Sequence, residues 1–510
     1  MNSYWKSWND GWQKQEKLSS DYVTDVCIIG AGICGLSTGY YLSKNGVNVI
    51  ILDKENIGEK ASGNTTAKIT LQHNLIHQYL INTYGIEYAS KYFKANKQAI
   101  DNIKSIINSE NIDCDYEKQE NYVYTTQKSE VENIQNEVRM INLLNSYIDD
   151  KSGNISEFVR DTSLPFEIEG AIKTNNQAQF HPLKYLYGLT NCIKKYGGLI
   201  FTNSLVDDMK KSGDDYVIYS NSYQIRAKYV VMAAHYPFIN FPGFHFLKMY
   251  QSTSYAIAIE TKEPKFDGMY INIKEPIYSF RTAKYNDKKL IILGGGEHKT
   301  GFAPESNKNY GYKILEDEAR KLYPDCKILY KWNTKDCITL DKIPYIGEFS
   351  SFMPNVFVAT GFNKWGMTSS NVAANIISDK ILGKHNEYED VFNSKRFKPI
   401  KNRGELKNMA KQVIGSFITN RLRIPVEDLS SINNDNGGII RTNGKTVGIY
   451  KNKEGKIYAV NPTCTHLGCL LTWNNLDKTW DCPCHGSRFD YNGKNIYDPA
   501  IKNLKRYNSL

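Results

Sequence analysis

The stretch DVCIIGAGICG, at residues 25–35, runs from an apolar strand pattern directly into the glycine pattern G-x-G-x-x-G. A helix-compatible stretch follows from Leu36 to Asn45, and a second apolar strand pattern from Val47 to Leu52 ends in Asp53. A strand, a glycine turn, a helix and a second strand in this order predict a Rossmann-type dinucleotide-binding unit.

The glycines and the aspartate of this unit have separate predicted roles. We expect Gly30 to form the tight turn, Gly32 to let the backbone approach a pyrophosphate, and Gly35 to let helix and strand pack closely. The start of the helix presents unpaired N–H groups to the phosphate charge. Asp53 follows Gly35 by 18 residues, and a carboxylate at about this distance binds ribose hydroxyls. The motif therefore predicts a bound dinucleotide.

The whole chain has 510 residues, of which 41% are hydrophobic and 23% charged. At roughly 150 residues per domain, this length allows about three or four domain-sized units. The composition excludes a disordered or collagen-like chain. No apolar run is long enough to cross a bilayer, and the N-terminal residues lack the apolar core of a secretion signal. We therefore expect a soluble, cytoplasmic protein.

Strand-like and helix-like segments alternate after the dinucleotide unit. Strand patterns include residues 229–233 and 290–293, and helix periodicity covers much of residues 86–107 and 129–144. This alternation predicts an α/β architecture with substantial parallel sheet. From about Ile424 the sequence changes to short strand patterns separated by glycine-containing turns, which predicts a small all-β module.

The net charge of +10 is concentrated toward the C-terminal end. Residues 1–394 carry 44 Lys and Arg against 45 Asp and Glu, whereas residues 395–510 carry 20 against 9. We interpret residues 395–423 as a basic, solvated linker, with peripheral contact to an anionic membrane as the alternative. No stacking aromatic residues interleave with these charges, so we expect no nucleic-acid partner.

Three further segments bear on the identity of the dinucleotide. They are EKASGNTTAKI at residues 59–69, DKIPYIG at residues 341–347 and VFVATGFNKWGMT at residues 356–368. These segments resemble signatures of the D-amino-acid-oxidase and glycine-oxidase superfamily, which binds FAD. The strand pattern from Lys228 to Ala234 resembles the one that returns to the cofactor in this family, although His235 stands where a small residue is more usual.

The resemblance implies FAD as the cofactor and names the residues that contact it. The helix after the last signature is expected to aim its N-terminus at the flavin, because a positive dipole end stabilises the charge of reduced flavin. The expected FAD contacts are Gly30, Gly32, Gly35, Asp53, Lys54, Thr65, Thr66, Ala67, Gly361, Gly366 and Met367.

Two other features of this part concern cofactor type and attachment. No second G-x-G-x-x-G stands in a βαβ context, so we expect no NAD(P)H site of this kind. Some members of the family attach flavin covalently through His or Cys, but Thr65 and Thr66 occupy the corresponding loop. We therefore expect non-covalent FAD, with His73 as the nearby residue that could change this expectation.

The C-terminal part carries two segments rich in cysteine and histidine, CTHLGC at residues 464–469 and CPCHGS at residues 482–487. Read as ligands, they give C-x-H, fifteen intervening residues and C-x-x-H. Two thiolates and two imidazoles suit a Rieske [2Fe–2S] centre, in which cysteines hold one iron and histidines the other. A tetrahedral zinc site is the alternative.

Both segments resemble the sequence motifs of the Rieske family at almost every position. The resemblance implies a cluster held by Cys464, His466, Cys482 and His485. It also implies a disulfide between Cys469 and Cys484. Cytosolic proteins seldom keep a disulfide, but burial beside a cluster can protect one. The other cysteines show no ligand spacing, and we expect them to be buried free thiols.

Two residues after the second segment affect the expected reduction potential. Ser487 matches a residue that donates a hydrogen bond to a cluster sulfur and so raises the potential. Phe489 stands where high-potential relatives carry a Tyr donor. With one donor fewer, we expect an intermediate value within roughly −150 to +300 mV.

These patterns and resemblances divide the chain into three parts. We expect an FAD-dependent oxidoreductase over residues 1–394, the basic linker over 395–423 and the Rieske domain over 424–510. Within the first part, the Rossmann-type FAD-binding domain is expected at about residues 22–80, 150–235 and 335–394. An interleaved α+β substrate domain is expected at about residues 81–149 and 236–334.

FAD accepts two electrons as a hydride, whereas a [2Fe–2S] cluster passes one electron at a time. We therefore predict an oxidoreductase that oxidises an amine or amino acid at a C–N bond and relays single electrons to or from an unidentified carrier. Arg281 is the candidate for a substrate carboxylate, because its fork geometry suits one. Tyr255 and His298 are weaker candidates.

Two other functions fit the same residues. In one, the protein is a reductase or electron-transfer protein in which the cluster feeds the flavin. In the other, the Rieske module is a structural or redox-sensing addition to an oxidase that uses oxygen.

Overall fold

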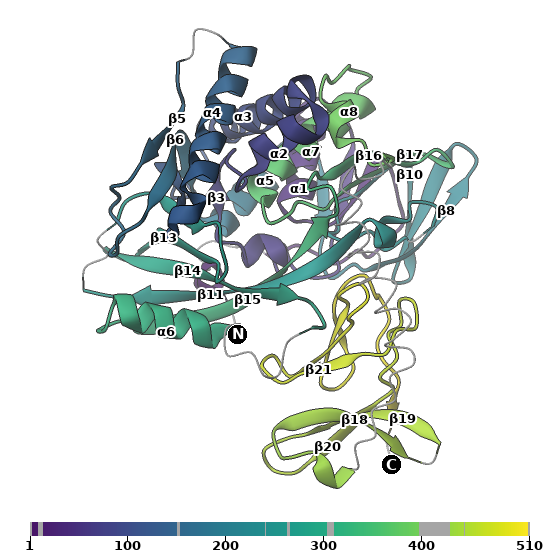
Figure 1. The fold of residues 1–510 in the computed structure, drawn as a ribbon. Coiled ribbons are helices and arrows are strands. Elements are labelled where there is room, and N and C mark those ends of the chain that lie inside the picture. Colours follow the sequence, from purple (N-terminus) through teal and green to yellow (C-terminus); the bar gives the residue numbers. More distant parts are fainter. Residues whose placement is uncertain are drawn as a thin grey trace.

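The computed structural model describes residues 3–8, 14–149, 153–239, 241–262, 266–302, 311–396, 429–442 and 444–507. Figure 1 shows a main body of sheets and covering helices, with the C-terminal residues forming a separate module beneath it. The predicted α/β body and the predicted all-β C-terminal module are both confirmed.

The first sheet contains the predicted dinucleotide unit. Its strand order is β16 (Tyr345–Ser350), β17 (Met353–Thr360), β10 (Tyr223–Met232), β1 (Tyr22–Ile29), β2 (Val49–Leu52) and β7 (Leu199–Phe201). Strand β9 (Asp215–Ser220) pairs with β10, and β8 (Val206–Ser212) pairs with β9.

Parallel pairing brings three strand ends to one edge of this sheet. β1 pairs in parallel with β2 and β10, and β10 pairs in parallel with β17. Ile29 is in register with Leu52 and Met232, and Met232 is in register with Val358. The turns that follow β1, β10 and β17 therefore lie side by side at the carboxyl edge, where α/β sheets bind ligands.

The second sheet extends from the first toward the C-terminal module. Its strand order is β15 (Lys327–Thr339), β11 (Met249–Glu260), β14 (Lys288–Lys299), β13 (Tyr278–Tyr285), β12 (Met269–Asn272), β4 (Glu117–Thr125), β6 (Gly170–Gln179) and β3 (Lys68–Ile69), with β5 (Ser156–Val159) paired to β6. Strands β3 and β6 lie in this second sheet although they come from residues 22–80 and 150–235.

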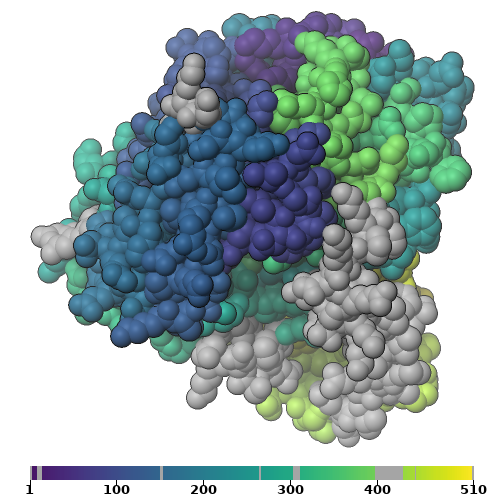
Figure 2. Space-filling view, turned by 45° about the horizontal axis from the view of Figure 1, so that its top comes forward, coloured from purple at the N-terminus to yellow at the C-terminus, as the bar shows by residue number. Residues whose placement is uncertain are grey.

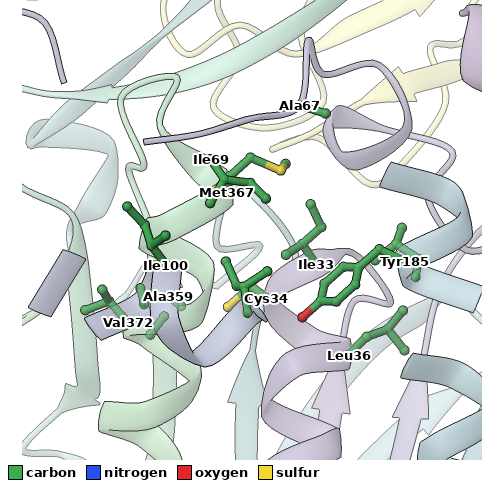
Figure 3. Packing of buried hydrophobic residues seen from close by; sticks show 14 of the residues in the cluster. Ile33, Cys34, Leu36, Ala67, Ile69, Ile100, Tyr185, Ala359, Met367 and Val372 are labelled. Atoms are coloured by element: carbon green, nitrogen blue, oxygen red, sulfur yellow. The ribbon is translucent and has the colours of Figure 1, made fainter. Parts of the chain in front are cut away.

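Helices cover the sheets and form the outer face shown in Figure 2, where residues of the C-terminal module appear in yellow-green at the lower edge. They are α1 (Ile33–Lys44), α2 (Ile76–Tyr84), α3 (Ile86–Ser109), α4 (Val131–Ile148), α5 (Pro182–Lys195), α6 (Tyr312–Leu322), α7 (Gly366–Ile381) and α8 (Glu389–Phe392). The predicted helices at 86–107 and 129–144 correspond to α3 and α4. Figure 3 shows side chains of α1 and α7 gathered in one buried core, among them Cys34, Leu36, Met367 and Val372.

The C-terminal module consists of two small antiparallel sheets. One has the order β18 (Asn436–Thr442), β19 (Lys445–Lys451), β20 (Ile457–Val460) and β25 (Arg506–Tyr507). The other has the order β21 (Thr472–Asn474), β22 (Thr479–Asp481), β23 (Arg488–Asp490) and β24 (Asn495–Tyr497). Figure 1 shows the β21 sheet between the main body and the β18 sheet.

Polar contacts hold the module against the main body. Lys54 and Asp498 form an ion pair with 2.6 Å between Nζ and Oδ1. Lys60 Nζ donates a hydrogen bond to the Ile496 carbonyl at 2.8 Å, and Gln251 Nε2 donates to the Asp498 carbonyl at 2.8 Å. The dinucleotide unit and the second sheet therefore both contact residues 496–498.

Two glycines let the backbones of the two parts approach closely. A Cβ atom on Gly301 would lie 2.4 Å from Pro483 Cα, and one on Gly486 would lie 2.6 Å from Gln251 Cβ. Because such distances exclude any side chain, the loop that carries residues 482–487 lies directly against the main body.

The predicted basic linker lies almost wholly outside the described residues. Its second residue, Arg396, is buried and belongs to the main body, since its guanidinium pairs with the Asp341 carboxylate through Nε at 2.7 Å and Nη2 at 3.0 Å. Among the described residues, no helix is both long and apolar enough to span a membrane.

We expect Gly301→Ala to loosen the module. Its new methyl group would overlap Pro483, and relieving such overpacking typically costs about 1–3 kcal/mol. Hydrogen–deuterium exchange should therefore become faster across residues 482–487. Gly213→Ala is the matched control, because Gly213 also has a positive φ, +66°, but its Cβ would contact nothing within 4 Å. Equal exchange in both variants would contradict the proposed close contact.

Candidate functional site

A large cavity lies at the carboxyl edge of the first sheet. It is bordered by the turns after β1, β10 and β17, by strands β11, β14 and β15 of the second sheet, and by the C-terminal module. The module contributes Tyr497, Asp498 and Ile501 to the wall. The cavity is therefore shared between the two parts of the chain.

The first turn of α1 opens into this cavity. Gly30, Gly32 and Ile33 line it. A Cβ on Gly32 would lie 2.9 Å from Ser62 Oγ, and one on Gly35 would lie 1.8 Å from the Gly30 carbonyl oxygen. Glycine at the second position thus lets Ser62 lie against the turn, and glycine at the third lets helix and strand pack closely, as in a dinucleotide fold.

Asp53 lies at the end of β2 and lines the cavity. Its carboxylate accepts hydrogen bonds from the backbone N–H of Ala31 at 2.7 Å and of Glu55 at 2.9 Å. Burial raises the pKa of this carboxyl to about 6. The two N–H groups fix the carboxylate in place, so that its remaining lone pairs can accept from ribose hydroxyls.

The first turn of α7 meets the cavity from the other side. Gly361, Gly366 and Met367 line it, and no side chain caps the N-terminus of the helix. Its free N–H groups and positive dipole end suit a negatively charged ring system. Two helix N-termini, those of α1 and α7, therefore face one cavity, which fits a molecule with a pyrophosphate and a flavin.

Most of the predicted FAD contacts line this cavity. Those that line it are Gly30, Gly32, Asp53, Lys54, Thr65, Thr66, Gly361, Gly366 and Met367. Gly35 and Ala67 do not line it. Gly35 serves helix packing, and the Ala67 carbonyl accepts a hydrogen bond from Arg281 at 2.8 Å.

His73, considered for covalent attachment, points elsewhere. Its Nδ1 is hydrogen-bonded to the Tyr92 hydroxyl at 2.7 Å, and its Nε2 lies 2.9 Å from the Thr70 carbonyl and 3.1 Å from the Thr368 hydroxyl. Its ring stacks on Trp365 at 4.9 Å between centroids. Both ring nitrogens are thus engaged in the protein interior.

The four predicted cluster ligands converge in the C-terminal module. The side chains of Cys464 and Cys482 interact with each other. The rings of His466 and His485 lie 5.0 Å apart between centroids, at 88°. Two sulfur and two imidazole ligands from paired loops are the set that a Rieske cluster requires.

The predicted disulfide is present. Cys469 and Cys484 are bonded, with 6.6 Å between their Cα atoms, and their sulfurs lie within 4.8 Å of that of Cys482. The side chain of Ser487 interacts with that of Cys464 and accepts a hydrogen bond from the Ala500 N–H at 3.0 Å. The disulfide joins the two ligand loops, and the hydrogen bond from Ser487 to a cluster sulfur stays a prediction.

Comparison with known proteins identifies both parts. Residues 25–380 match the family described as FAD dependent oxidoreductase, and residues 423–508 match the Rieske [2Fe-2S] domain. The chain belongs to the FAD dependent oxidoreductase family. It carries a Rieske domain at its C-terminal end, so its cofactors are FAD and a [2Fe–2S] cluster, and zinc is excluded as the expected metal.

Individual relatives support the same division. A Bacillus subtilis Rieske 2Fe-2S iron-sulfur protein, YhfW, is 36% identical over 504 residues, which are 99% of this chain and 97% of the relative. Gamma-glutamylputrescine oxidoreductase of Escherichia coli is 21% identical over 395 residues, 75% of this chain and 89% of the relative. The structure of glycine oxidase from Geobacillus kaustophilus has a TM-score of 0.60 at 16% identity, covering 74% of this chain and 100% of that one.

Arg281 of the FAD dependent oxidoreductase does not line the cavity. Its Nη1 donates to the carbonyls of Thr66, Ala67 and Phe180 at 3.0, 2.8 and 3.3 Å, and its Nε donates to the Thr282 carbonyl at 2.9 Å. A guanidinium has five N–H donors and needs acceptors for them when buried. This geometry favours a structural role for Arg281 over the predicted contact with a substrate carboxylate.

Of the weaker substrate candidates, Tyr255 lines the cavity and His298 does not. The His298 ring stacks on Tyr255 at 5.8 Å between centroids, at 26°. His298 therefore supports the wall that Tyr255 forms.

Sequence reasoning missed several residues of this site. Lys68 and Tyr236 line the cavity, as do Tyr497 and Asp498 of the Rieske domain. No motif marks Tyr236 or the Rieske pair, because their place depends on how the two domains meet. Lys68 lies within the quoted segment at residues 59–69, so its position near the flavin loop could have been noticed.

We expect Arg281→Met to lower the melting temperature of the holoprotein. It would leave buried carbonyls without donors, at a cost of about 1–3 kcal/mol for each unsatisfied group. Thermal unfolding followed by protein and flavin fluorescence measures the change, and the exposed Arg320→Met is the control. Unchanged stability together with weaker binding of carboxylates would instead support the predicted substrate contact.

Proposed function

We propose that this protein oxidises an amine or an amino acid at its C–N bond, with FAD as the hydride acceptor, and that the Rieske cluster exchanges the electrons singly with a carrier. The shared cavity is the observation that carries the proposal, since Tyr497, Asp498 and Ile501 of the Rieske domain border the same space as the FAD motif. Bound there, FAD supplies two-electron chemistry and the cluster one-electron chemistry.

The residues assigned to each cofactor are part of this proposal. FAD is held by the cavity-lining contacts named above, with α1 at the pyrophosphate and α7 at the flavin. The cluster is held by Cys464, His466, Cys482 and His485. The division into residues 1–394, 395–423 and 424–510 stays a prediction, and the burial of Arg396 against Asp341 extends the main body at least to residue 396.

The wall of the cavity in the second sheet suits an organic substrate. Trp332, Ile271 and Ile277 line it, and Trp365 at the start of α7 also borders the cavity. Apolar and aromatic walls with few polar groups are typical of small-molecule sites, because they exclude water and bury the ligand. We place the substrate against this wall.

Lys68 is the cation in this wall that can bind a substrate carboxylate. Its Nζ donates hydrogen bonds to the hydroxyls of Ser279 at 3.0 Å and Thr66 at 3.3 Å. Burial, together with the nearby charge of Arg281, lowers the pKa of Lys68 to about 7. Hydroxyls do not neutralise an ammonium group, so an anionic ligand would stabilise its charged form.

We expect carboxylate binding to weaken as the pH rises above about 7. Below this pH Lys68 is already charged, and above it the protein must take up a proton to bind an anion, which costs up to about tenfold in affinity per pH unit. Propionate, a carboxylate without an amine, is the probe, and the change in flavin absorbance reports its binding between pH 6 and 9.

The control separates Lys68 from a neighbour that titrates in the same range. Asp336 also lines the cavity, and burial raises its pKa to about 7. Lys68→Met should bind propionate weakly. Its affinity for propionate should vary less with pH than that of the wild type, because only Asp336 still titrates. Lys68→Arg should bind it without loss at pH 8. If Lys68→Met bound propionate with unchanged affinity, Lys68 would not be the residue that binds the carboxylate.

Anaerobic stopped-flow mixing tests the reaction itself. We expect an amine or amino-acid panel to bleach the flavin of the holoprotein for at least one member, followed by reduction of the cluster. Flavin that stays oxidised with every member, but becomes reduced when a one-electron donor reduces the cluster, would instead support a reductase. Full turnover with peroxide release in a Cys482→Ser variant would support an oxidase with an accessory Rieske domain.

A further inference from the structure

The ring of Tyr236 lies between the two cofactor sites. Tyr236 follows β10 by four residues and lines the FAD cavity. Its other side faces the Rieske domain, where its ring lies 6.4 Å from that of His466 between centroids, at 79°. One side chain therefore contacts both the cavity and a cluster ligand.

The surroundings of Tyr236 are apolar and closely packed. It forms a small buried cluster with Met249 and Cys337, against which Phe246 packs. Phe246 in turn lies 5.7 Å from His485 between ring centroids, at 89°. Both histidine ligands thus face aromatic side chains of the FAD domain. Tyr236 also lines the cavity, whereas Phe246 does not.

The hydroxyl of Tyr236 is buried, and it has no hydrogen-bond partner among the described residues. Oxidation of a tyrosine releases its phenolic proton, which requires an acceptor. Within the part of the chain that the structure describes, this hydroxyl has none. The part of Tyr236 that links the two sites is therefore its ring, which packs between the cavity and His466.

We propose that the Tyr236 ring is the bridge for electron transfer between FAD and the Rieske cluster of the same chain. The inference rests on the proposed function. One electron passes from reduced flavin to the oxidised cluster, the second follows after a one-electron carrier has reoxidised the cluster, and the proton that the flavin gained with the hydride is released to water. Electron tunnelling slows steeply with distance, and more steeply through a void than through packed atoms, so a ring that fills this gap speeds the transfer.

Tyr236→Leu and Tyr236→Phe test the bridge in the full-length holoprotein. A light flash with a sacrificial donor reduces the flavin without substrate, and cluster absorbance and electron paramagnetic resonance follow the arrival of the electron. We expect Tyr236→Leu to slow the concentration-independent phase several-fold, because it removes the ring. Tyr236→Phe keeps the ring and should retain the rate. The midpoint potentials of both cofactors are measured in each variant, so that a change in driving force is recognised.

Phe246→Leu is the matched control. It removes an aromatic contact with the other histidine ligand and leaves the cavity wall intact, so it should keep the wild-type rate. The proposal is overturned if Tyr236→Leu transfers electrons as fast as wild type, if Phe246→Leu slows transfer equally, or if Tyr236→Phe is as slow as Tyr236→Leu at unchanged potentials. Because light replaces the substrate, a failure of the proposed amine oxidation leaves this test intact.

Discussion

Parallel pairing of β1, β10 and β17 is the constraint on which the dinucleotide cavity and its contact with the Rieske domain depend. The three strands run in one direction and end in register, so the turns that follow them meet at a single edge. The turns after β1 and β17 lead into α1 and α7, whose N-termini face one cavity. A pyrophosphate and a reduced flavin are both negatively charged, and both are stabilised by free N–H groups and positive dipole ends.

The third turn, after β10, connects this edge to the Rieske domain. The chain leaves β10 through His235 and Tyr236, which line the cavity, and the rings of Tyr236 and Phe246 lie against those of His466 and His485. Lys54 strengthens the connection, since it follows Asp53 in the dinucleotide unit and pairs with Asp498 of the Rieske domain. The Rieske domain thus forms part of the wall of the cavity.

Arg281 and Lys68 are two cations near Thr66 that have different surroundings and therefore different roles. Arg281 uses its planar fork to satisfy four backbone carbonyls, and this fixes the loop around Thr66. Lys68 contacts two hydroxyls and faces the cavity. A guanidinium keeps its charge in such an environment, whereas an ammonium loses part of it and regains it when an anion binds. Arg281 therefore shapes the site, and Lys68 is available to a ligand.

The sequence alone was enough to predict every feature that depends on one short segment. The glycines at 30, 32 and 35, the acid at 53, and the ligand loops at 464–469 and 482–487 work through their own backbone and spacing, so both cofactors and the fold class could be predicted. The role of Arg281 could not, because whether a buried cation meets carbonyls or a ligand depends on segments distant in sequence. For the same reason, the sequence could not predict that the cavity is lined by Tyr236, Tyr497 and Asp498. Their place in the cavity depends on how the two domains meet, and contact between segments distant in sequence is a property of the folded chain alone.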